Sequence, residues 1–121
     1  MVGSLAVLDT TLTGEQRDAL ARLVSSSRGR LGARLSRTVL FGSRARGDAD
    51  EESDIDVLFL TADEPTLEDR RTLSGLAADL QVDTGAFLPF SLVLLSRARF
   101  DELLARERRF ALDVEREGIA L

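Results

Sequence analysis

The chain has no cysteine, no histidine and no lysine among its 121 residues, and each absence excludes a kind of chemistry. Without cysteine there is neither a disulfide framework nor a thiolate metal site. Without histidine, the side chain that most often transfers protons near neutral pH is missing. The absence of lysine excludes a catalytic lysine. Any catalysis by this chain must therefore use carboxylates, hydroxyls, arginines and a metal ion.

Long apolar runs and an excess of basic residues are also absent. No apolar run approaches the roughly 20 residues that span a bilayer. The first residues lack the basic region of a secretory signal, so we expect a soluble, cytoplasmic protein. The formal net charge of -5 argues against nucleic acid as the main partner, because nucleic-acid-binding domains are usually basic. The length predicts a single domain, residues 1–121.

Apolar periodicity predicts helices and strands in a simple order. Thr13 is a capping residue with a glutamine three positions on, and it precedes a run with helical spacing over about 14–30 that ends near Gly32. Residues 1–12 have no settled period. Further helices are predicted from Thr66 or Pro65 to about Gly85 and over 96–118 with a bend near 106–109, and strands over 38–41, 55–60, 87–95 and 119–121. This order indicates an α/β or α+β layer structure with helices against a small sheet.

Most of the functional information lies in residues 39–60, V-L-F-G-S-R-A-R-G-D-A-D-E-E-S-D-I-D-V-L-F-L. Asp54 and Asp56 lie two positions apart along the second strand, so their side chains point to one face, roughly 6.6 Å apart. Their charges repel by roughly 2 to 3 kcal/mol at an effective dielectric near 20, and Mg²⁺ would reverse that repulsion. Asp-x-Asp alone is more often a solvated strand face. Here the apolar neighbours Ile55 and Val57 bury the strand, where an unpaired carboxylate is costly.

Gly42 and Ser43 directly follow the first predicted strand. Glycine lets the backbone approach a ligand closely, and N–H groups at the start of a turn or helix suit a phosphate. Ser43 adds a hydroxyl, and Arg44 and Arg46 can supply bidentate contacts to a phosphate, so we treat these four residues as nucleotide-binding candidates. Taken alone, the pattern is more often an ordinary strand-to-helix turn with solvated arginines.

Together, G-S-R-A-R-G at 42–47 and S-D-I-D-V-L at 53–58 resemble the DNA polymerase beta-like nucleotidyltransferase superfamily, and most closely its minimal nucleotidyltransferases. The resemblance implies a small mixed β-sheet flanked by helices. It also implies that the Gly-Ser turn holds the triphosphate of ATP, and that Asp54 and Asp56 are catalytic residues that ligate Mg²⁺. An acceptor hydroxyl would then attack the α-phosphate, and pyrophosphate would leave.

One position departs from that family. Its catalytic members usually carry a third carboxylate on a later strand, where this chain has Ser91. Serine is a poor metal ligand and is not a base at neutral pH. Asp83 is the nearest upstream acidic residue, and we expect it in a loop before the strand.

The resemblance also implies a biological setting. Small stand-alone members often occur beside a HEPN-domain ribonuclease toxin, which they counter by transferring AMP to a toxin tyrosine. This favours an antitoxin-type protein adenylyltransferase. Ser91 favours the alternative of a catalytically degenerate nucleotidyltransferase fold that binds a nucleotide or a partner protein. A third possibility, transfer to a small molecule such as an aminoglycoside, usually needs a further domain.

Overall fold

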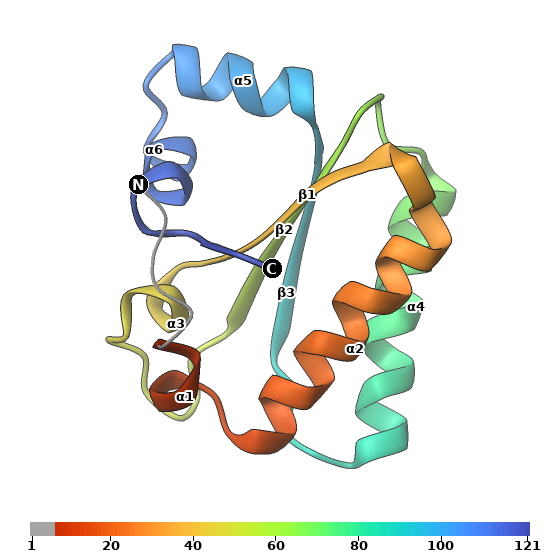
Figure 1. Ribbon diagram of the computed structural model, residues 1–121, viewed down its shortest axis with the longest axis vertical. Coiled ribbons are helices and arrows are strands. Elements are labelled where there is room, and N and C mark those ends of the chain that lie inside the picture. Colours follow the sequence, from red (N-terminus) through yellow and green to blue (C-terminus); the bar gives the residue numbers. More distant parts are fainter. Residues whose placement is uncertain (1–6) are drawn as a thin grey trace.

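The computed structural model describes residues 7–121, and the side chain of Asp9 is not described. A mixed sheet lies between two pairs of helices (Figure 1). The elements in chain order are α1 Leu8–Thr11, α2 Gly14–Leu31, the 3₁₀ turn η2 Gly32–Arg34, β1 Leu35–Phe41, α3 Ser43–Arg46, β2 Ile55–Thr61, α4 Leu67–Thr84, β3 Phe90–Ser96, α5 Arg97–Ala105, α6 Arg109–Glu117 and β4 Ile119–Ala120. This architecture confirms the predicted small mixed sheet flanked by helices.

The sheet has four strands in the order β3-β2-β1-β4. Strand β1 pairs antiparallel with both β2 and β4, whereas β2 and β3 run parallel. The two central strands, β1 and β2, thus connect the Gly-Ser turn after β1 to the aspartate pair at the start of β2. In this register Asp56 lies opposite Phe41 on one side and opposite Ser91 on the other.

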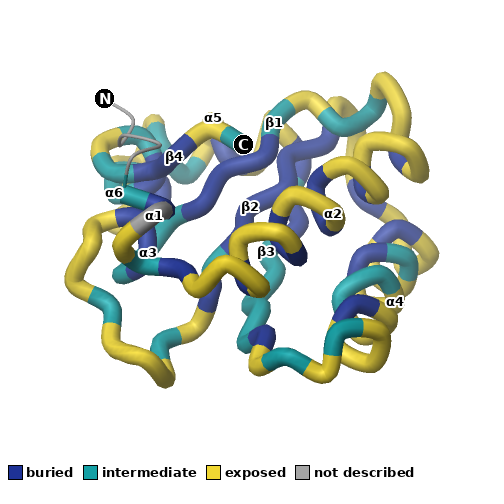
Figure 2. Tube along the Cα trace, turned by 60° about the horizontal axis from the view of Figure 1, so that its bottom comes forward, coloured by how far each residue is buried: buried dark blue, intermediate teal, exposed yellow. Residues whose placement is uncertain are grey.

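Both faces of the sheet are covered by helices. Val57 and Phe59 of β2 belong to the core under α2 and α4, and Leu58 and Leu60 belong to a second, smaller core that includes α5 and α6 residues. These four side chains are at most 2% exposed. A strand covered on both faces has a continuous apolar run, as residues 57–60 of β2 do, and Figure 2 shows this part of β2 buried.

Local sequence signals predicted where the helices begin and bend. Helix α2 begins with the predicted capping box, in which Thr13 and Gln16 satisfy each other's backbone N–H groups. Serines and Gly29 in its second half do not interrupt it. The last helical region divides into α5 and α6 near the predicted bend, where Glu107 has a φ of 54°.

Several boundaries differ from the sequence prediction, and the first strand begins at Leu35 and not at Thr38. Helix α4 continues to Thr84, so Asp83 is a helical residue and not a loop residue, and it pairs with Arg22 of α2 at 3.7 Å. The third strand begins at Phe90 and not at Phe87. Pro89 has no N–H to donate to a ladder, so pairing starts after it.

Residues 1–12, for which the sequence shows no settled period, are described from residue 7 onward. Residues 8–11 form the short helix α1, which contacts α3, whereas residues 1–6 lie outside the described part of the chain. Among the helices of residues 7–121, none is long and apolar enough to cross a bilayer.

Candidate functional site

The fold brings the Gly-Ser turn and the paired aspartates together at one end of the sheet. Strand β1 runs into Gly42, and its antiparallel partner β2 starts directly after Asp54, so the two motifs meet. Asp56 lies two positions before Leu58 and therefore points to the same face of the sheet, the face covered by α5 and α6. Asp54 is exposed and Asp56 is half-buried. The pair thus lies at the open margin of the smaller core.

Gly42 packs directly against the Asp56 carboxylate. Its φ of 75° and ψ of -158° lie in a region that side-chain-bearing residues rarely adopt. A Cβ atom at this position would lie 2.4 Å from Oδ2 of Asp56. The turn therefore needs glycine for its backbone conformation and also for the space that the carboxylate occupies.

The charge of Asp56 is poorly compensated by the protein. Burial and the neighbouring charge of Asp54 raise the pKa of Asp56, while a hydrogen bond from Ser91 and the charge of Arg46 partly oppose that rise. Among residues 7–121, neither aspartate has an ion pair within 4.0 Å. Two hard oxygen donors that lack a cation fit a divalent metal ion such as Mg²⁺.

Ser91 lies beside Asp56 on the adjacent parallel strand. It is thus next to the aspartate pair. In the described residues, no group of three or more acidic, histidine or cysteine side chains is arranged to hold a metal.

The two arginines of α3 have different surroundings. Arg46 is partly exposed and pairs with Asp48 at 3.2 Å and with Glu117 at 3.5 Å. These two carboxylates, Asp48 first, raise its pKa. Its positive charge also partly opposes the rise in the pKa of Asp56. Glu117 did not emerge from motif spacing, because it lies far along the chain from α3.

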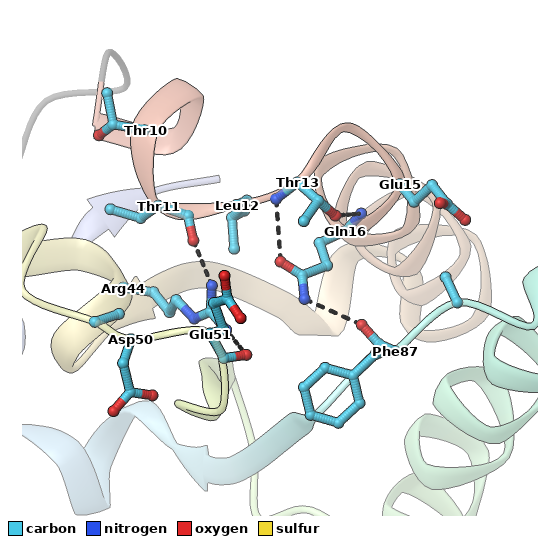
Figure 3. A pocket seen from close by; sticks show the side chains of 12 residues that line it. Thr10, Thr11, Leu12, Thr13, Glu15, Gln16, Arg44, Asp50, Glu51 and Phe87 are labelled. Carbon is cyan, nitrogen blue, oxygen red and sulfur yellow. Dashed lines mark hydrogen bonds between the residues drawn. The ribbon is translucent and has the colours of Figure 1, made fainter.

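Arg44, by contrast, is only 4% exposed. Its guanidinium donates to the backbone carbonyls of Thr11, Glu51 and Ser53. Figure 3 shows Arg44 beside Thr11 and Glu51. The Arg44 guanidinium, which the sequence suggested for phosphate contacts, is therefore engaged by these backbone carbonyls. Its donors are directed into the protein, because the acidic loop, residues 47–53 between α3 and β2, folds back over α3.

A cavity of about 510 Å³ lies beside this loop (Figure 3). It is bounded by α1, the start of α2, the acidic loop and the segment before β3. Arg44 is the only predicted site residue among those lining it. The Gly-Ser turn and the two aspartates thus lie outside the lining of this cavity, at the ends of the strands.

Comparisons with known proteins agree with this geometry. The model of the nucleotidyltransferase domain family matches residues 22–110. A putative protein adenylyltransferase from Methanocaldococcus jannaschii is 51% identical over 45 residues, which are 37% of this chain and 46% of that protein. The match therefore spans less than half of that relative.

Two solved structures share the fold. A putative minimal nucleotidyltransferase is 30% identical, with a TM-score of 0.55, and the similarity covers 88% of this chain and 95% of that one. A toxin-antitoxin solved with AMP-PNP is 23% identical, with a TM-score of 0.52, and the similarity covers 89% of this chain and 72% of that one. With its Gly-Ser turn packed on an aspartate pair and the family model matched over most of its length, this chain belongs to the nucleotidyltransferase domain family.

Proposed function

We propose that residues 1–121 form one nucleotidyltransferase domain that transfers AMP from ATP to a hydroxyl of a partner protein. The reaction would depend on Mg²⁺ and take place in the cytoplasm, with the chain acting as the antitoxin of a HEPN-type ribonuclease toxin. One observation carries the catalytic part of this proposal. The Gly42 backbone lies against the Asp56 carboxylate, so a phosphate bound at the turn would lie next to the paired carboxylates.

Each residue of the site has a distinct part in the proposed reaction. The first N–H groups of α3 have no acceptor within that helix, so those of Ser43 and Arg44 can donate to the triphosphate, together with the Ser43 hydroxyl. Arg46 adds positive charge. Asp54 and Asp56 would hold Mg²⁺, which when bound supplies charge neutralisation and alignment of the phosphates.

The transfer itself exchanges a phosphoanhydride bond of ATP for a phosphoester bond to the acceptor. The acceptor oxygen bonds to the α-phosphorus, the bond from that phosphorus to the bridging oxygen breaks, and pyrophosphate leaves. The acceptor hydroxyl loses its proton to solvent water, because Ser91 is not a base at neutral pH. The chain therefore contributes mainly binding, alignment and charge, which supply most of the catalysis in phosphoryl-type transfers.

The proteins similar to this chain support a protein acceptor. The relative from Methanocaldococcus jannaschii is named as a protein adenylyltransferase. The toxin-antitoxin structure, which resembles this chain in fold, contains an ATP analogue. The HEPN type of the toxin rests on the resemblance of the motifs to minimal nucleotidyltransferases.

Transfer to a partner can be tested directly. The protein is incubated with Mg²⁺, the product of the adjacent gene and ATP labelled at either the α- or the γ-phosphate. We expect label on the partner from α-labelled ATP only, because AMP and not phosphate is transferred. The Asp54→Ala/Asp56→Ala variant should give none, whereas Asp18→Ala, a change at an exposed aspartate of α2, should label normally. Absence of transfer, together with toxin neutralisation that survives in the double variant, would refute the enzymatic proposal.

Ser91 supports a second candidate function, a degenerate nucleotidyltransferase fold that neutralises its partner by binding alone. Because Ser91 adjoins Asp56, Ser91→Asp would place a third carboxylate at the pair. We expect this variant to transfer AMP at least about 10-fold faster than the wild type, through tighter metal binding. Ser91→Asn, which has similar size and no charge, is the matched control. If Ser91→Asp transfers AMP and the wild type does not, that result would instead support the degenerate fold.

A further inference from the structure

We infer that Arg44 is a positioning residue for Asp54, acting through the backbone that precedes this aspartate. The inference rests on the proposed function, in which Asp54 is a metal ligand. It assigns to Arg44 a part that differs from phosphate binding. The guanidinium would fix the C-terminal end of the acidic loop, so that Asp54 and Asp56 can ligate the same metal ion.

The guanidinium links two segments that are far apart in the sequence. Its Nε and Nη2 atoms donate to the carbonyl of Ser53 at 3.2 and 2.8 Å, and Nη2 also donates to Glu51 at 3.3 Å. Its Nη1 atom donates to the carbonyl of Thr11 in α1. Figure 3 shows this group between α1 and the loop. Arg44 thus ties both the N-terminal segment and the acidic loop to α3.

This arrangement requires an arginine. Among the described residues, Arg44 has no carboxylate within 4.0 Å, so its buried charge is compensated at close range by carbonyl dipoles. The planar guanidinium presents five N–H donors in a fixed fork and can serve three carbonyls at once. Lysine has a single ammonium group at the end of a flexible chain, so it cannot span the same acceptors.

Asp54 needs such support more than Asp56 does. Asp56 lies within β2, with ladder partners on both sides, a hydrogen bond from Ser91 and the Gly42 backbone against its carboxylate. Asp54 is exposed and precedes the first paired residue, Ile55. The backbone of Asp54 is therefore fixed by the ladder on its C-terminal side, and by the contacts of Ser53 on its N-terminal side.

The acidic loop has few other anchors at this point. Ser53 also closes a local turn with Asp50, through its own N–H at 3.3 Å and its hydroxyl at 3.1 Å. That turn is internal to the loop, so it shapes the loop without attaching it to the rest of the protein. The guanidinium supplies an attachment at the carbonyl next to Asp54.

Manganese binding provides the test, because Mn²⁺ is a paramagnetic substitute for Mg²⁺. Binding of Mn²⁺ with a non-hydrolysable ATP analogue is measured by electron paramagnetic resonance for wild type, Arg44→Met and Arg44→Lys. We expect both variants to bind about 10- to 100-fold more weakly, the loss typical of residues that orient metal ligands. Exchange of the Glu52 and Ser53 amide hydrogens should also be faster. Arg28→Met is the matched control, because Arg28 also donates to a backbone carbonyl, that of Leu121, away from the site.

The outcomes separate this inference from the proposed function. A wild type that does not bind Mn²⁺ with the nucleotide contradicts the proposed function and this inference with it. A wild type that binds, with equal affinity in the folded Arg44 variants, contradicts this inference alone. If Arg44→Met does not fold, Arg44→Lys, which keeps the charge and most of the length, provides the comparison.

Discussion

Replacing Asp56 with asparagine should abolish transfer and at the same time stabilise the protein in the absence of metal. Transfer should fall by well over 10²-fold, since even residues that only orient metal ligands cost up to about that factor. The variant loses the charge repulsion with Asp54, worth about 1 kcal/mol at this partly exposed site. For a domain of this size, that gain should raise the melting temperature by roughly 3 to 6 °C.

With divalent metal and nucleotide bound, we expect the wild type to be more stable than Asp56→Asn. Saturating Mg²⁺ and an ATP analogue would stabilise the wild type by about 2.7 kcal/mol at 100 times the dissociation constant, and Asp56→Asn by much less. Thermal unfolding with chelator and with Mg²⁺ plus the analogue measures both effects. Asp18→Asn, at an exposed position on α2, should change neither. A variant that melts below the wild type in chelator, or gains as much from the ligands, would contradict the assignment of Asp56 as a metal ligand.

Replacing Gly42 with alanine should damage stability and catalysis together. The new Cβ would lie 2.4 Å from Oδ2 of Asp56, so either the turn or the carboxylate must move. The backbone conformation adds strain of about 1 to 3 kcal/mol. We expect a loss of roughly 2 to 4 kcal/mol in the free energy of unfolding, measured by urea titration, and at least about 10²-fold slower transfer.

A control variant at Gly32 separates the backbone strain from the contact with Asp56. Gly32 has nearly the same backbone conformation, with φ of 59° and ψ of -139°, but a Cβ there would meet no atom within 4 Å. Gly32→Ala should therefore show the backbone strain alone and retain transfer. Asp56→Ala should make Gly42→Ala less costly by removing the obstructing carboxylate, a coupling that a double-mutant cycle measures. Equal costs for the two glycine variants would show that the contact with Asp56 is unimportant.

Sequence reasoning succeeded where the determining interactions are local. A capping residue satisfies N–H groups three positions away, so Thr13 and Thr66 indicate where α2 and α4 begin. The turn after β1 needs glycine for its own backbone angles, and Gly42 marks it. The Gly-Ser motif at 42–47 and the aspartate motif at 53–58 together were sufficient to indicate the nucleotidyltransferase family, which the family model shows.

The tertiary structure decided how these pieces meet, because the contacts involved join residues with no regular spacing along the chain. Parallel pairing of β2 with β3 puts Ser91 beside Asp56, and antiparallel pairing with β1 brings Gly42 onto the same carboxylate. The two arginines of α3 look alike in sequence. Only the fold of the acidic loop buries Arg44 against backbone carbonyls and leaves Arg46 partly exposed, since burial depends on which segments fold back over a helix.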